Sequence, residues 1–296
     1  MSGNLAARRL LFLRPQVNLS RAAAARMWLV AACAALAVLQ SSLTDSFASL
    51  TVALSAVAAA IVSELLCSLK RGGPFLGDGS AIASALVLTL LLPNRLHPLA
   101  AALGACFAMV TAKFSFGGLG ANWANPALAG WLFIRYSWPA AFEAALEGSP
   151  VLLLSGEAGA AGFTQWAAAS ASGSLADTLS RDAAAFLNDT VLSLFGAKLP
   201  EGYMGLLLPS APGIIADRGL FALLVGTILI TAARVSRFWI PLLFLAVYAL
   251  LARCFGAIPW GGGFGEGDML YGLFCGGVIA AAFLTAAEPV TGPKSR

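Results

Sequence analysis

The chain has 296 residues, of which 59% are hydrophobic and 11% are charged, and its formal net charge is +4. Soluble domains contain about 45–50% apolar and about 25% charged residues, so this composition excludes an ordinary water-soluble globular protein. The chain is better divided into membrane spans of roughly 20 apolar residues each.

The first 26 residues form a basic segment that contains five arginines and no acidic residue. Such a segment can bind nucleic acid or lipid head groups, but directly before an apolar span it acts chiefly as a topology signal. We therefore predict that residues 1–26 are cytoplasmic and that nucleic acid is not a partner.

Apolar segments then follow along the chain, and they predict an all-α polytopic membrane protein with about eight transmembrane or re-entrant helices. The predicted segments are 27–43, 48–67, 80–93, 97–114, 125–139, 219–233, 238–256 and 267–287. The third segment is short and follows a run of glycines and a proline, which favours a broken or re-entrant helix. Basic turns at Lys70, Lys113 and Arg234 agree with a cytoplasmic N-terminus.

The segments define three regions after the basic N-terminus. Residues 27–139 form a first group of membrane helices, and residues 218–296 form a second group with a cytoplasmic tail. Between them, residues 140–217 contain too few large apolar residues for a core of their own, and we expect an extracytoplasmic loop region. The five cysteines are scattered singly, and we expect them to be small core residues rather than metal ligands.

The first motif is the run of residues 77–81, Gly-Asp-Gly-Ser-Ala, at the start of the short apolar segment. An acid here can accept hydrogen bonds from the free backbone N–H groups of a helix N-terminus. Two interpretations stay open. Asp78 is a helix cap and nothing more, or it lies beside a cofactor or cation in a protein-lined cavity.

The second motif is the stretch of residues 116–130, FGGLGANWANPALAG. Its candidate ligand-binding residues are Gly117, Gly118, Asn122 and Asn125. Glycines let the backbone approach a ligand, asparagines offer both donors and acceptors, and Pro126 suits the first turn of a helix. This mixture suits the polar edge and apolar face of an isoalloxazine ring, with Trp123 or Phe116 as a stacking wall. The alternative is a plain turn between two spans.

Three stretches of the chain resemble the RnfD/NqrB family. Residues 75–93, FLGDGSAIASALVLTLLLP, and residues 114–139, FSFGGLGANWANPALAGWLFIRYSWP, are similar to its two membrane signatures and have similar spacing. The tail at residues 285–293, TAAEPVTGP, is similar to the family's TDPVT-x-P turn, with Glu288 in place of the usual aspartate.

The resemblance implies a subunit of an Rnf- or Nqr-type complex in the bacterial inner membrane. In such a complex electrons pass through flavins, and the released free energy moves Na⁺ or H⁺ across the bilayer. The subunit would not be catalytic alone, and its partners would be the other subunits of the complex. The family carries covalent FMN, and a second, non-covalent flavin, riboflavin or FMN, would bind near the turn at residues 117–126.

The family attaches its FMN through a phosphoester to a threonine in a motif resembling S-G-A-T-x-L. The nearest match here is SGSLADTLS at residues 172–180, so Thr178 is the candidate attachment site. The match departs from the pattern in having two extra residues after Gly173, Asp177 before the threonine, and leucine directly after it. Thr190 and Thr164 are weaker candidates, and the absence of covalent flavin is a further alternative.

Two other departures concern the second half of the chain. Residues 212–219 stand where the family has a glycine-rich turn containing glutamate, and Asp217 is the acid that would replace it. The chain also stops just after the tail turn, where the family continues through at least one more hydrophobic hairpin. We therefore expect a truncated chain or a shortened relative.

A few ionisable residues fall within or beside the predicted spans. Glu64 lies inside an apolar span, where a charge is costly unless it is paired or faces a cavity. We expect Lys113 and Arg135 to extend to the membrane interface, and His97 to lie at the surface.

Two other classes of function stay open. Gly/Pro-interrupted segments are also typical of secondary transporters and channels with broken helices, which would move a solute and bind no cofactor. A flavin-free membrane scaffold that keeps the fold is the second alternative, since the attachment motif is imperfect.

Overall fold

The computed structural model describes only part of the chain. The described residues are 21–71, 77–115, 122, 124–146, 186, 189–190, 193, 213–235, 238–256, 258, 263–265, 267 and 269–288. The candidate residues Thr178, Thr164, Gly117 and Gly118 lie outside them, as do both ring residues proposed for stacking.

The described part is mostly helical, and most of its helices lie within the predicted apolar segments. Residues 139–145 and 215–218 are also helical, although they fall almost entirely within the region 140–217 that was predicted as a loop. The first group comprises α2 (Arg21–Thr44), α3 (Ala48–Arg71), α4 (Ser80–Leu90), α5 (Pro98–Phe107), the π-helix η1 (Ala108–Phe114), α6 (Pro126–Ser137) and α7 (Pro139–Ala145). The second group comprises α11 (Ile215–Arg218), α12 (Leu220–Ala232), α13 (Trp239–Phe255), α14 (Met269–Phe274), α15 (Val278–Ala280) and the π-helix η5 (Ala281–Ala286). In these residues, α2 and α3 contain apolar stretches long enough to cross a bilayer, Ala24–Thr44 and Ala48–Leu69.

Large apolar side chains lie on the outside of the protein, which is the pattern of a chain dissolved in lipid. On α13 only Pro241 and Ala249 are buried, whereas Leu243, Leu250 and other large residues of this helix are exposed. Contiguous apolar surface of this kind marks an interface with a membrane or a partner. Together with the long apolar helices, this surface identifies a helical membrane protein, as the composition predicted.

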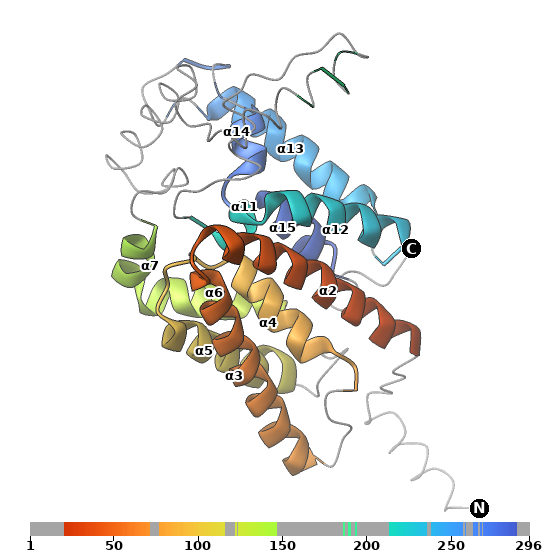
Figure 1. The fold of residues 1–296 in the computed structure, drawn as a ribbon, viewed down its shortest axis with the longest axis vertical. Coiled ribbons are helices and arrows are strands. Elements are labelled where there is room, and N and C mark those ends of the chain that lie inside the picture. Colours follow the sequence, from red (N-terminus) through yellow and green to blue (C-terminus); the bar gives the residue numbers. More distant parts are fainter. Residues whose placement is uncertain are drawn as a thin grey trace, which may run out of the picture.

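Helix α2 joins the two groups of helices. It packs against α4 of the first group and against α11 and α12 of the second, so it lies between them (Figure 1). Helices α3, α5 and α6 complete the first group around α4. The position of α4 matters for the rest of the fold, because the elements around it pack against this helix.

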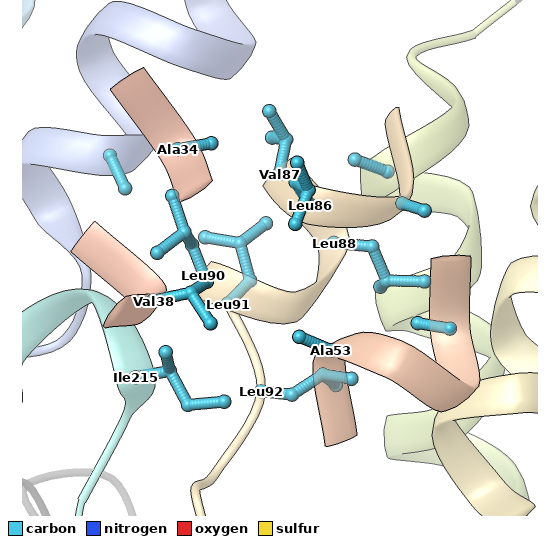
Figure 2. Close-up of a cluster of buried hydrophobic side chains, with 14 of the residues drawn as sticks. Ala34, Val38, Ala53, Leu86, Val87, Leu88, Leu90, Leu91, Leu92 and Ile215 are labelled. Atoms are coloured by element: carbon cyan, nitrogen blue, oxygen red, sulfur yellow. The ribbon is translucent and has the colours of Figure 1, made fainter. Parts of the chain in front are cut away.

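Helix α4 is an eleven-residue helix enclosed by protein. At 1.5 Å per residue it is roughly 16 Å long, about half of a hydrocarbon core of about 30 Å. Figure 2 shows its leucines pointing outward in several directions, toward Ala34 and Val38 of α2, Ala53 of α3 and Ile215 of α11. Burial on all sides explains why its sequence, SAIASALVLTL, is apolar all round instead of amphipathic.

Beyond α4 the chain is extended and pairs with the segment before α11. The Ile215 N–H donates to the Leu92 carbonyl at 3.0 Å, and the Asn94 N–H donates to the Gly213 carbonyl at 2.9 Å. The Asn94 side chain accepts a third bond from the Gly213 N–H at 3.1 Å. The short helix therefore ends inside the protein with its backbone groups satisfied, which is the condition for irregular backbone at membrane depth. The segment that was predicted as a broken or re-entrant helix is thus a short helix, α4, followed by an extended segment.

Small residues allow α2 and α12 to approach closely. A Cβ atom at Gly219 would lie 2.2 Å from the Ala37 carbonyl oxygen, and one at Gly226 would lie 2.9 Å from the Cys33 Cβ. Close backbone approach at small residues is a common way for helices to pack in lipid. Cys33 therefore has the small-core role that its sequence context predicted, and none of the five cysteines, all of which are described, forms a disulfide.

Replacing Gly226 by leucine should separate α2 from α12 and lower the melting temperature of the detergent-solubilised protein. We expect a loss of about 1–3 kcal/mol, the usual cost of overpacking. The matched control is Val225→Leu, because Val225 is the preceding residue of the same helix and is 42% exposed. Circular dichroism during heating gives the melting temperature of both variants. If Gly226→Leu and wild type have the same melting temperature, the close approach of α2 and α12 is contradicted.

Candidate functional site

The three sequence stretches that carry the family resemblance meet at one cavity. The short helix contributes Ala83, Ser84 and Val87, the second signature contributes Asn125 and Ala127, and the tail contributes Ala287 and Glu288. The remaining lining residues are Met27, Val30, Ile230, Val235, Phe283 and Leu284. The empty space between these residues is about 450 Å³ with its open side included.

Asn125 holds the second signature in place through three hydrogen bonds. Its Oδ1 accepts from the backbone N–H of Ala127 at 2.9 Å and of Leu128 at 3.2 Å, so it caps α6, and Pro126 occupies the first turn. Its Nδ2 donates to the Thr285 carbonyl at 3.4 Å. One side chain thus joins the start of α6 to the end of η5 at the cavity wall.

Asn122 presents a buried acceptor without a protein partner. Its Oδ1 is inaccessible to solvent and accepts no hydrogen bond within the described residues. A buried amide oxygen left in this way costs about 1–3 kcal/mol, so a bound donor would stabilise it. It lies three residues before Asn125, in the stretch that was predicted to bind a ligand.

Trp28 supplies an aromatic surface that the sequence motifs did not indicate. Gly79 has φ +66°, and a Cβ atom there would lie 2.8–2.9 Å from three atoms of the Trp28 indole. Both the backbone conformation and the ring contact therefore require glycine before α4. Trp28 and the apolar lining residues of α2 and α12 could not be singled out in the sequence, because nothing distinguishes them from other residues of an apolar span.

Asp78 lies at the mouth of α4 and begins a chain of polar contacts. Its Oδ1 accepts from the backbone N–H of Ser80 at 3.0 Å and from the Ser80 hydroxyl at 2.9 Å. These are local bonds of the capping kind, and Asp78 does not line the cavity. The structure thus supports the capping interpretation directly, while a role beside a cofactor remains a prediction.

Lys113 does not extend to the interface as the sequence suggested. Its side chain is 2% exposed, and its Nζ donates to Glu64 Oε1 at 2.8 Å and to the Ser80 hydroxyl at 2.6 Å. The partner of Glu64 was not identifiable in the sequence, since 49 residues separate the two. Arg135, in contrast, is partly exposed and binds Glu143 at 3.0 Å. His97 is exposed and caps α5 by accepting from the Leu99 N–H.

Asp217 binds the backbone at the break between α14 and α15. Its two carboxylate oxygens accept from the backbone N–H groups of Gly276 at 2.8 Å and Gly277 at 2.7 Å. The neighbouring Arg218 donates to the Thr44 hydroxyl at 2.7 Å, and its Nε lies 3.9 Å from Asp45. The acid expected at this turn is therefore buried and structural, because it satisfies backbone donors at the break in the helix.

The lining of the cavity combines apolar side chains with a few polar groups. Its wall is mostly apolar, and polar groups enter from Ser84, Asn125 and Glu288. That chemistry fits the isoalloxazine ring of a flavin. Within the part of the chain that the structure describes, no group of three or more His, Cys, Asp or Glu side chains could hold a metal ion.

Comparison with known proteins agrees with the resemblance drawn from the three stretches. The chain matches the NQR2, RnfD, RnfE family over residues 12–296. It is 27% identical over 290 residues to a subunit of the proton-translocating ferredoxin:NAD(+) oxidoreductase complex of Clostridium ljungdahlii, covering 95% of this chain and 78% of that protein.

Two other relatives extend the comparison. The chain is 32% identical to a subunit of the ion-translocating oxidoreductase complex of Stutzerimonas stutzeri, covering 81% of this chain and 68% of that protein. It is 33% identical to a subunit of the Na(+)-translocating NADH-quinone reductase of Neisseria meningitidis serogroup B, covering 54% of this chain and 34% of that protein. The chain belongs to the NQR2, RnfD, RnfE family, and these relatives are subunits of ion-translocating oxidoreductase complexes.

Proposed function

We propose that the chain is the membrane subunit of an Rnf- or Nqr-type complex in the bacterial inner membrane, and that it carries electrons through flavin while the complex moves Na⁺ or H⁺. The observation that carries the proposal is the meeting of the three family stretches at one cavity. Residues far apart in the chain have no reason to share such a site if each were only a turn between spans.

In this proposal the cavity binds a non-covalent flavin, riboflavin or FMN. The flavin, when bound, supplies the redox chemistry, and the protein supplies binding, orientation and exclusion of water. Asn125 and Asn122 offer amide groups to the polar edge of the ring, and Gly117 and Gly118 would let the backbone approach it. Met27, Phe283 and the other apolar lining residues keep water away.

A covalent FMN on Thr178 is the second part of the proposal. The phosphoester requires a hydroxyl on an accessible loop, and Thr178 is the best match to the family's attachment motif in this chain. The N-terminus and the basic turns would lie in the cytoplasm, and Thr178 would lie on the outer face. The two flavins would then be on opposite sides of the membrane.

Thr178→Val should remove the covalent flavin and leave the non-covalent one. The experiment is intact-mass analysis of the purified chain, produced together with its flavin transferase, with in-gel fluorescence after denaturation. Wild type should show a mass increase matching FMN, and the variant should show none. If Thr178→Val keeps the added mass, FMN is attached to another residue. The variants Thr190→Val and Thr164→Val then test the other two candidate sites.

Asn125→Asp should weaken the non-covalent flavin without unfolding the protein. Aspartate keeps the oxygen that caps α6 but loses the amide donor at the cavity wall, so we expect flavin affinity to fall roughly tenfold, the equivalent of about 1.4 kcal/mol. Asn125→Leu should also lose the cap and about 1 kcal/mol of stability.

Flavin released by acid precipitation of the purified complex measures the non-covalent flavin, since covalent FMN stays on the chain. Leu128→Val is the control, because Leu128 belongs to the same helix turn but is exposed. A wild-type complex that releases no flavin would reject the cavity assignment, and solute flux into proteoliposomes would then test the transporter alternative.

A further inference from the structure

A continuous chain of hydrogen bonds runs from the mouth of α4 to a fully buried carboxylate. It passes from Asp78 to the Ser80 hydroxyl at 2.9 Å, from Ser80 to the Lys113 ammonium at 2.6 Å, and from Lys113 to Glu64 at 2.8 Å. Asp78 is partly exposed, whereas Glu64 is 4% exposed and Ser80 and Lys113 are each 2% exposed. The four groups therefore connect the protein surface to its interior.

The buried end of this chain has an acceptor without a partner in the part of the protein that the structure describes. Glu64 Oε1 accepts from Lys113, but Glu64 Oε2 is buried and has no hydrogen-bond partner within the described residues. An ion pair that served packing alone would gain from bonding both oxygens, because the desolvation of a buried carboxylate is costly. The open oxygen is a place where a proton can be held.

The chain of polar groups lies one helix turn away from the wall of the proposed flavin site. Ser80 lies four residues before the cavity-lining Ser84 on α4, and residues four apart lie on the same helix face, about 5–6 Å between Cβ atoms. A negative charge placed in the cavity would therefore act on the polar chain at short range, in surroundings of low dielectric constant. Reduction of a bound flavin supplies such a charge.

We infer that Asp78, Ser80, Lys113 and Glu64 form a proton relay that loads a proton onto Glu64 when the flavin in the cavity is reduced. This inference rests on the proposed flavin site and adds a named proton path to it. It assigns the buried Glu64–Lys113 ion pair to a role in ion movement.

The transfer balances without any further reactant. Asp78 takes a proton from water. The Lys113 ammonium passes a proton to the Glu64 carboxylate, the Ser80 hydroxyl passes its proton to the resulting amine, and Asp78 returns one to the Ser80 oxygen. The proton taken up at Asp78 thus arrives on Glu64, Lys113 is again an ammonium, and no electron moves along the chain.

The other groups near the relay are few among the described residues. Helix α5 contributes the Cys106 thiol, which lies 3.3 Å from the hydroxyl of Ser63, the residue before Glu64. Helix α2 contributes Trp28 against Gly79 and the exposed Arg26 beside it. Helix α6 carries Arg135, whose described ion pair is with Glu143 of α7. The charged groups in direct contact along the chain are Asp78, Lys113 and Glu64.

The decisive variant is Ser80→Ala, because it removes the central hydroxyl and keeps the Glu64–Lys113 ion pair. The purified complex is studied by infrared difference spectroscopy between its dithionite-reduced and air-oxidised forms, in H₂O and in D₂O. Wild type should show a protonated-carboxyl band that shifts in D₂O, and Glu64→Gln should lack it. Ser80→Ala should form the band roughly tenfold more slowly or worse, and Ser80→Thr should restore it.

Three controls make the outcome decisive. Arg135→Met removes the matched, partly exposed ion pair and should leave the band unchanged. The double variant Glu64→Gln with Lys113→Met avoids an unpaired buried charge if the single variant is unstable, and it too should lack the band. Flavin content is measured in every sample.

The failures are distinguishable. A complex without non-covalent flavin refutes the proposed site itself. The relay is overturned if the wild-type complex contains the flavin and is reduced normally but shows no carboxyl band. It is also overturned if the band is unchanged in Glu64→Gln and in the double variant. An unchanged rate in Ser80→Ala overturns the path through Ser80.

Discussion

The enclosed half-helix α4 is the constraint on which the rest of the structure depends. A helix that stops inside the bilayer leaves backbone groups without partners, and each would cost several kcal/mol in lipid. At its start the Ser80 N–H is bound by Asp78, and after its end the chain pairs with residues 213–215. The second half of the chain must therefore be folded against the first for α4 to end where it does.

The same requirement explains the buried charges. Asp217 binds the two free N–H groups at the break between α14 and α15, and the Lys113 ammonium binds the hydroxyl at the start of α4. Breaking a buried pair such as Lys113–Glu64 costs about 3–5 kcal/mol, mainly because one charge is left uncompensated. Asp217 and Lys113 thus bind groups at places where helices begin or are interrupted.

Much of the fold could be predicted from the sequence because bilayer physics is simple. Apolar length marks the longer helices, and these fall on the predicted segments, whereas the short helices α7 and α11 do not. Pro126 was also predicted correctly to occupy the first turn of a helix, since its fixed backbone conformation is a local property. The glycine run before Ser80 was interpreted correctly as an interruption of a span, because glycine and proline act on the backbone locally.

The contacts between distant residues could not be predicted in the same way. Nothing in the sequence places Lys113 beside Glu64, and an isolated lysine near the end of a span ordinarily extends to the interface. The convergence of the tail with the two signatures depends on the packing of η5 against α13 and α15, and on the bond from Asn125 to Thr285. Phe283 became a lining residue of the cavity only through this packing.

The position of α4 also joins the two parts of the proposed mechanism. Its first turn contacts the buried ion pair through Ser80, and its next turn lines the cavity through Ala83 and Ser84. A displacement at one end of a helix that is buried on all sides also moves its other end, because a closely packed interior is not easily deformed. Charge in the cavity and charge on the ion pair are therefore coupled by geometry, without any large motion of the protein.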